Sequence, residues 1–217
     1  MSDNAAAGEP LDAIEREQLC DLFLDLGPDA PTLCEGWATL DLAAHLVMRE
    51  RDPRSGLAIL GGERFAGLEQ RLMTKARAQG YEKLVERLRS GPPPVPWRVP
   101  GLRTFLNLTE WYVHHEDVRR ANGQPPRTDR PDLDRALWDL LGRTGRMVVR
   151  GIDGAGLAVE APGHGHRTLK KGEHLVTVTG GPQELLLFAH GRRSVAQVEL
   201  AGDDAGLAAV AAAKLGV

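Results

Sequence analysis

The residues best suited to chemistry gather in one short stretch, TEWYVHHEDVRRANG, which runs from Thr109 to Gly123. Successive residues of an α-helix turn by about 100°, so positions i, i+4 and i+7 fall on one stripe. Glu110, His114 and Asp117 have this spacing, and we expect them to share one helix face. His115 is turned to the flank of that stripe. The doubled histidine therefore does not predict a doubled ligand.

A second candidate helix offers a partner for this face. His45 lies in LDLAAHLVMRE among apolar residues, on a surface expected to point inward. A buried carboxylate and imidazole need polar partners. His45, Glu110 and His114 could surround one point in a helix-bundle core and leave a coordination position open, as catalytic zinc sites do. The alternative is that each histidine is a hydrogen-bonded core residue, because Glu and His four residues apart occur by chance in many helices.

Two aspartates could support these ligands from outside. Asp117 could orient His114 or a bound water, or it could serve helix packing or pair with an arginine. Asp41 lies one turn before His45 and could accept a hydrogen bond from it. Asp41 also falls in the first helical turn, where the helix dipole favours a carboxylate without any metal.

Weaker candidates for binding a substrate lie elsewhere. Trp37 could line the entrance to a substrate site, although a role in packing is the favoured interpretation. Arg192 and Arg193 end a short predicted helix and could bind an anionic substrate or the carboxylate of a thiol cofactor. They could equally complement the negative end of that helix. Cys34 precedes the Gly-Trp pair and could come near a metal, although a small buried apolar residue is favoured.

Charge and composition exclude several classes of function. The chain has 217 residues with 27 basic residues interleaved among 30 acidic ones, so neither a nucleic-acid stripe nor a polybasic membrane patch is predicted. No apolar run approaches the ~18 residues of a membrane span, and the N-terminus lacks the order of a signal peptide. We therefore expect a cytoplasmic protein. The two cysteines show no CxxC spacing, so a metal would have to use His and carboxylate.

Helical periodicity dominates the first part of the chain. Gly27-Pro28, Pro53, Gly80 and Asn122-Gly123 supply the breaks between predicted helices, and residues 91–101 form a stiff polyproline-like connection. The predicted helices cover residues 11–26, 40–51, 61–79, 81–90, 103–122 and 131–151. This pattern predicts an up-and-down helix bundle over residues 1–150.

Beyond a boundary at residues 151–156, short β-branched runs replace the helical periods. Strands are predicted at 156–163, 174–181 and 194–202, and helices at 182–191 and 203–216. The stretch GHGHRTLKKGE is predicted to be a hairpin loop. Residues 151–217 should thus form a small α+β domain, which makes the whole chain α+β.

Two motifs carry a family resemblance. The segments CEGWATLDLAAHL and EWYVHHEDVRRANG resemble the metal-binding helical bundle of the actinobacterial, mycothiol-dependent maleylpyruvate isomerase family, within the DinB/YfiT-like superfamily. The resemblance covers residues 10–150. Carried over residue by residue, it places the family's zinc ligands on His45, Glu110 and His114. The tail is similar to the small sterol-carrier-like domain that often accompanies this bundle.

The resemblance implies Zn²⁺, Ni²⁺ or another divalent ion, with a low-molecular-weight thiol such as mycothiol as cofactor or co-substrate. The expected function is a thiol-dependent transferase or isomerase acting on a small electrophilic molecule, with small-molecule partners only. Metal-assisted hydrolysis and a non-catalytic metal- or ligand-binding or regulatory module remain alternatives, because fold does not fix chemistry.

Overall fold

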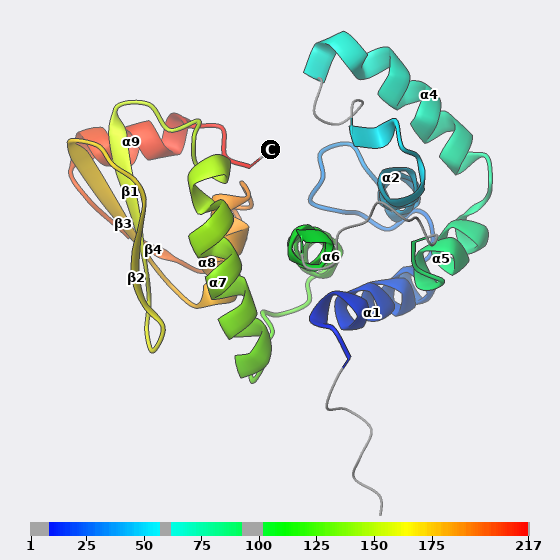
Figure 1. Cartoon of the computed structure of the whole chain (residues 1–217), viewed down its shortest axis with the longest axis horizontal. Coiled ribbons are helices and arrows are strands. Elements are labelled where there is room, and N and C mark those ends of the chain that lie inside the picture. Colours follow the sequence, from blue (N-terminus) through cyan, green and yellow to red (C-terminus); the bar gives the residue numbers. More distant parts are fainter. Residues whose placement is uncertain (1–8, 57–61, 93–101, 217) are drawn as a thin grey trace, which may run out of the picture. The chain divides into compact units, whose positions relative to one another are not determined.

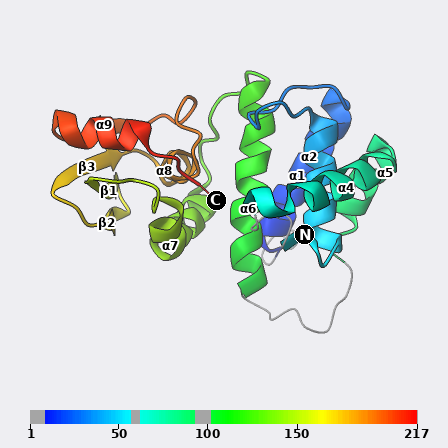
Figure 2. The same ribbon diagram turned by 90° about the horizontal axis from the view of Figure 1, so that it is seen from above.

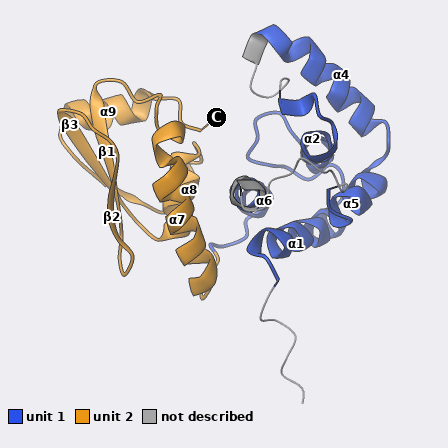
Figure 3. Cartoon of the chain, in the orientation of Figure 1, with its two compact units in different colours: residues 1–126 blue, residues 127–217 orange. Residues whose placement is uncertain are grey.

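The computed structural model describes residues 9–56, 62–92 and 102–216. The chain divides into two compact units, residues 1–126 and residues 127–217 (Figure 3). Helices and one small sheet together confirm the predicted α+β class. The predicted polyproline-like connection lies largely outside the described residues.

The first unit is built from helices (Figure 1). Helix α6 packs along α1, α1 also packs on α5, and α2 packs on α4 and α5. Figure 1 views α2 and α6 nearly end-on, and Figure 2 shows α6 from the side. The elements are α1 (Leu11–Leu26), α2 (Thr39–Arg51), the 3-10 turn η1 (Gly62–Phe65), α4 (Ala66–Arg77), α5 (Tyr81–Arg89) and α6 (Leu102–Ala121).

Apolar faces of these helices meet in one core. Apolar residues of α1, α2 and α5, many of them leucines, form one buried cluster with Trp111 of α6, which is 1% exposed. Burying such side chains stabilises the unit by about 1.5–3 kcal/mol each. The core includes Leu19, Phe23, Leu42, Leu46, Leu84 and Leu88.

Local signals explain the helix ends that position the site. Gly27 ends α1 with φ +80°, and its N–H donates to the Phe23 carbonyl. The first turn of α2 is closed by Asp41, whose Oδ2 accepts from the Ala38 N–H at 3.0 Å. The break predicted at Gly80 is confirmed: its φ of +87° separates α4 from α5 and suits a residue without Cβ.

The second unit combines helices with a four-stranded sheet of order β2-β1-β3-β4. Strand β1 is parallel to β3 and antiparallel to β2, and β3 is antiparallel to β4. Leu157, Val159, Val176 and Val178 are fully buried on paired positions of β1 and β3. The elements are α7 (Pro131–Val148), β1 (Ala155–Ala161), β2 (Gly165–Lys170), β3 (His174–Thr179), α8 (Pro182–Ala189), β4 (Glu199–Ala201) and α9 (Asp204–Ala212).

The division between the units differs from the boundary expected at residues 151–156. The break lies at Pro126/Arg127, and α7 belongs to the second unit because it packs on α8 and β2. Gly145 allows this close approach, since a Cβ there would lie 2.7 Å from a methyl carbon of Leu169. Arg167 of β2 also covers the Trp138 ring of α7 at 4.6 Å.

The hairpin-loop prediction for GHGHRTLKKGE was wrong in part. Its residues 165–170 form strand β2, which pairs with β1. Leu169 is the one fully buried side chain on this edge strand, so the apolar alternation that identifies a strand is missing from the sequence. Among the described residues, no helix combines the length and apolar character needed to cross a membrane.

Candidate metal centre

The site lies where α2, α6 and the loop before α2 meet. Main-chain hydrogen bonds fix that loop: the Leu33 N–H donates to the Asp117 carbonyl at 3.1 Å, and the Thr39 N–H donates to the Ala30 carbonyl at 2.9 Å. The Asn122 side-chain amide also donates to the Pro31 carbonyl at 3.0 Å. The loop is therefore attached directly to α6, the helix that carries most of the polar residues.

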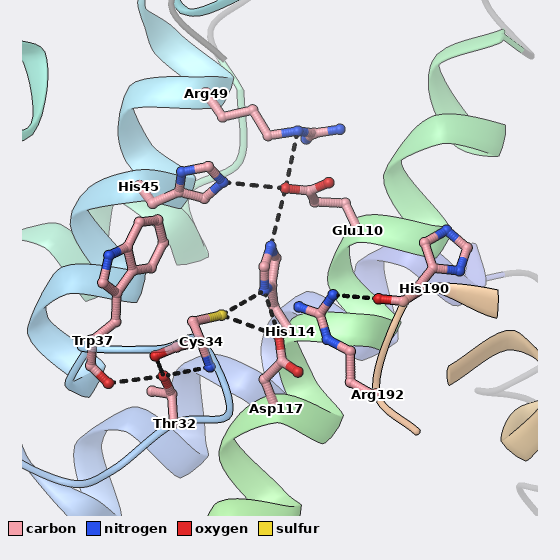
Figure 4. A network of polar contacts seen from close by, with 10 residues as sticks. All are labelled: Thr32, Cys34, Trp37, His45, Arg49, Glu110, His114, Asp117, His190 and Arg192. Atoms are coloured by element: carbon pink, nitrogen blue, oxygen red, sulfur yellow. Dashed lines mark hydrogen bonds and ion pairs between the residues drawn. The ribbon is translucent and has the colours of Figure 1, made fainter. Parts of the chain in front are cut away.

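Three potential ligand atoms converge between the helices. His45 Nε2 lies 3.5 Å from Glu110 Oε1, and His114 Nε2 lies 3.2 Å from the same oxygen. All three atoms lie within 4.8 Å of one another. Figure 4 shows the two imidazoles and the carboxylate pointing toward one another. The structure thus brings together the three residues that helical phase and family resemblance selected.

The donor set fits a divalent ion. His114 Nδ1 lies 2.9 Å from Asp117 Oδ2, so a neutral imidazole that donates its proton there presents a lone pair at Nε2. That lone pair would face an oxygen lone pair of Glu110, a repulsive contact unless a proton or a metal ion lies between them. Two imidazole nitrogens and one carboxylate oxygen are ligands that zinc and its neighbours accept.

The electrostatics of the site agree with this geometry. Burial by itself would raise the pKa of Glu110, but hydrogen bonds from His114 and His45 and the charge of Arg49 hold it well below its usual range. Burial would lower the pKa of His114, yet Asp117, Cys34 and Glu110 raise it well above its usual range. The site therefore favours an anionic carboxylate beside a positive charge.

Asp117 supports His114 from behind. Its side chain is fully buried, and Oδ2 also accepts from the Cys34 thiol at 3.3 Å. The Cys34 sulfur lies 3.9 Å from His114 Nδ1. A carboxylate on the far nitrogen of a metal-binding histidine fixes the ring orientation and its tautomer. The orienting role considered for Asp117 is thus consistent with its contacts.

The other candidates occupy different positions. Asp41 caps α2 and pairs with Arg77 at 2.6 Å. These contacts agree with the alternative in which Asp41 stabilises the first turn of the helix. The Trp37 ring lies 5.1 Å from the His45 ring and packs against the core of the first unit.

The two arginines lie in the second unit. Arg192 Nη1 donates to the His190 carbonyl, as Figure 4 shows. Arg193 donates to the carbonyls of Ala211 and Ala213 and lies over the Phe188 ring. The described contacts of Arg193 thus tie the end of α9 to the segment after α8.

Two further contacts of the centre involve residues outside the predicted ligand set. Arg49 pairs through Nε with Glu110 Oε1 at 3.2 Å, and Cys34 contacts Asp117. Arg49 follows His45 by one helical turn, and this spacing could have predicted its contact with the centre. The place of Cys34 before the Gly-Trp pair allowed a position near the metal but did not favour it, because that position depends on the path of the loop. His115 contacts Glu15 of α1 instead, which agrees with its expected place on the flank.

Comparison with solved structures identifies a known fold. The fold is similar to that of mycothiol-dependent maleylpyruvate isomerase. One structure of that enzyme has a TM-score of 0.59 at 18% identity, covering 88% of this chain and 90% of that chain. A histidine-to-alanine mutant of the enzyme has a TM-score of 0.58 at 19% identity with the same coverage. No protein-family model and no curated protein sequence matches the chain.

These likenesses confirm the resemblance seen in the sequence at the level of the fold. They span both units, so the similarity extends beyond the helices that carried the sequence motifs.

Proposed function

We propose that the protein is a divalent-metal- and thiol-dependent enzyme, a transferase or isomerase of the maleylpyruvate isomerase type, acting on a small electrophilic molecule. The observation that carries the proposal is the convergence of His45 Nε2, Glu110 Oε1 and His114 Nε2 in a fold shared with a mycothiol-dependent isomerase. Neither the donor set nor the fold would support it alone, because similar folds host different chemistries.

Each residue of the centre has a physical role in this proposal. His45, Glu110 and His114 would hold the ion, which when bound would supply positive charge that lowers the pKa of a thiol. Asp117 accepts the Nδ1 proton of His114 and so directs Nε2 toward the ligand position. The Cys34 thiol donates to the same carboxylate and limits its rotation. Three protein ligands leave room for a thiol from solution.

Metal content is the first test. Protein purified without chelators should contain about one divalent ion per chain, measured by inductively coupled plasma mass spectrometry. His45→Ala and His114→Ala should each lose it, because only two ligands remain. His166→Ala is the control, since His166 is exposed on β2. Full metal content in both site variants would show that these residues are not the ligands.

Thiol dependence is the second test. Metal-loaded protein is incubated with mycothiol and a panel of small electrophiles, with substrate and free thiol measured separately. A transferase consumes thiol with the substrate, whereas an isomerase converts substrate and returns the thiol. Turnover that persists without any thiol would instead indicate metal-assisted hydrolysis. Stoichiometric metal without turnover would support the non-catalytic alternative.

A further inference from the structure

A permanent cation, the guanidinium of Arg49, lies beside the proposed ligand set. Arg49 follows His45 by one turn of α2, and its Nε lies 3.2 Å from Glu110 Oε1. In the described part of the chain, Glu110 is the acidic residue with which Arg49 forms an ion pair. Figure 4 shows the guanidinium on the opposite side of this oxygen from His114. Both side chains are largely buried, with 22% and 23% of their surfaces exposed.

Arg49 approaches the same oxygen that would bind the metal. Glu110 Oε1 also faces His45 Nε2 at 3.5 Å and His114 Nε2 at 3.2 Å. An imidazole can release its proton when a metal arrives, but a guanidinium stays charged at any working pH. The repulsion between Arg49 and a bound dication therefore cannot be relieved by proton loss.

Two effects of Arg49 on metal binding oppose each other. Its hydrogen bond holds the Glu110 carboxylate in place, which favours binding. Its charge opposes a dication bound to the adjacent oxygen, which disfavours binding. The hydrogen bond orients a single carboxylate, whereas the repulsion acts between a permanent cation and a doubly charged ion in the same largely buried site. Charge repulsion should therefore be the stronger effect.

We propose that Arg49 sets the metal affinity of this centre by lowering it. The inference rests on the proposed metal site and adds a role for a residue outside its ligand set. With part of the Glu110 charge compensated by Arg49, the bound ion retains more of its positive charge for an incoming ligand. Arg49 is thus a positioning residue with two effects. It lowers the affinity for the metal, and it strengthens the polarisation of the incoming ligand.

The test measures zinc affinity of the metal-free protein by competition with a chromophoric chelator. Arg49→Gln and Arg49→Met should bind zinc about ten-fold or more tightly than the unchanged protein. Arg49→Lys keeps the charge and should stay closer to the unchanged protein. The matched control is Arg54→Gln, which removes the same charge from an exposed pair with Asp52 and should change affinity less than about two-fold.

A gain in affinity distinguishes this role from a structural one, because damage to the site would weaken binding. Met retains the apolar contacts of the arginine stem, so it provides a second variant if Gln disturbs folding. Equal or weaker zinc binding by both folded neutral variants would overturn the role of Arg49 and leave the metal site standing. Absence of zinc binding by the unchanged protein would instead overturn the proposed function, and this inference with it.

Discussion

The two cysteines show how strongly a residue depends on its surroundings. Cys20 is fully buried in α1, and burial raises the pKa of its thiol to about 12. Cys34 is partly exposed in the loop before α2 and contacts the buried carboxylate of Asp117. The reactive form of cysteine is the thiolate, and modification also needs access. The two thiols should therefore differ in reactivity.

Alkylation should modify one cysteine per folded chain. At pH 8 a thiol with a pKa of about 12 is thiolate in roughly one molecule in ten thousand. Iodoacetamide should therefore label Cys34 and spare Cys20 until the protein is unfolded, as intact-mass and peptide mass spectrometry can show. Cys34→Ser should abolish labelling of the folded protein. Labelling of Cys20 under native conditions would contradict its burial.

Replacing Asp117 by Asn should weaken metal binding without removing a ligand. The amide no longer carries the charge that holds the His114 ring, and loss of such a partner costs roughly 10- to 100-fold in metal affinity. Chelator competition measures the effect. Asp21→Asn is the control, because Asp21 pairs with Arg89 on the surface. An affinity equal to that of the control would remove Asp117 from the supporting role.

Sequence reasoning at the residue scale worked where helical phase decides position. The spacing of Glu110, His114 and Asp117 on one helix fixes their common face, so the structure brings them together as expected. The contact of Arg49 with the centre was missed, and that of Cys34 was considered but not favoured. Their positions depend on how a second helix and a loop pack against α6, which one-dimensional periodicity does not contain.

At the scale of elements, the loop between β2 and β3 depends on a close approach of backbones. A Cβ on Gly172 would lie 2.3 Å from the Gly156 nitrogen and 2.4 Å from the Ala155 carbonyl carbon. These are main-chain atoms, so a small side-chain movement cannot relieve the clash. Glycine is required at position 172 because there is no room for a Cβ, and not because the backbone is left-handed.

Gly172→Ala should therefore destabilise the second unit. Overpacking of this kind costs about 1–3 kcal/mol in the free energy of unfolding, measurable by urea denaturation. Gly181→Ala is the matched control, because a Cβ there meets nothing within 4 Å. Its effect should stay within about 1 kcal/mol. Equal effects for the two variants would indicate that the backbones separate freely.

A pH-dependent contact anchors the start of α9. His174 Nδ1 lies 2.8 Å from Asp203 Oδ2, and Asp203 Oδ1 accepts from the Gly206 N–H. The hydrogen bond to Asp203 raises the pKa of His174, and the bonds from His174 and Gly206 lower the pKa of Asp203. The histidine contributes stability below its ordinary pKa of 6.5 and loses it as pH rises through the raised value.

The aspartate contribution is present above its ordinary pKa of 3.8 and is lost as pH falls through the lowered value. The stability difference between the unchanged protein and His174→Ala should therefore be largest between these two pKa values. Urea denaturation at pH 3, 5 and 9 measures it, and added salt should reduce it because the pair is exposed. A difference that does not change with pH would contradict this pairing.

Sequence patterns predicted the helices better than the strands. Helices α1, α2 and α6 follow apolar periods with recognisable breaks, so their positions were expected. Strand β2 was missed because an edge strand exposes most of its side chains. Strand β4 is shorter than the run expected at 194–202, spanning only Glu199–Ala201. Pairing with a neighbouring strand defines these elements, and pairing is not a local property.

At the scale of the whole molecule, helix α7 decides where the chain can be divided. It packs on α8 and β2, so the second unit includes a helix that sequence texture assigned to the first. Leu133, Leu137 and Leu141 of α7 are fully buried. Removing α7 would expose the surfaces of α8 and β2 on which it packs.

A fragment of residues 127–217 should fold alone, whereas a fragment of residues 151–217 should not. The longer fragment retains α7 and the core it covers, and the shorter one exposes that apolar surface to water. Circular dichroism and thermal melting distinguish a cooperative transition from a featureless one. Cooperative melting of the shorter fragment would favour a boundary at residues 151–156.

Four consecutive residues of α6 are committed to different partners. His114 faces Glu110, His115 contacts Glu15, Glu116 binds Arg119 and Arg120, and Asp117 holds His114. A one-residue insertion or deletion before this run would turn His115 away from Glu15 and His114 away from His45 at once, because these partners lie on other helices. Redesign of the proposed metal centre should therefore begin on α2, where His45 and Arg49 can be exchanged with fewer simultaneous losses.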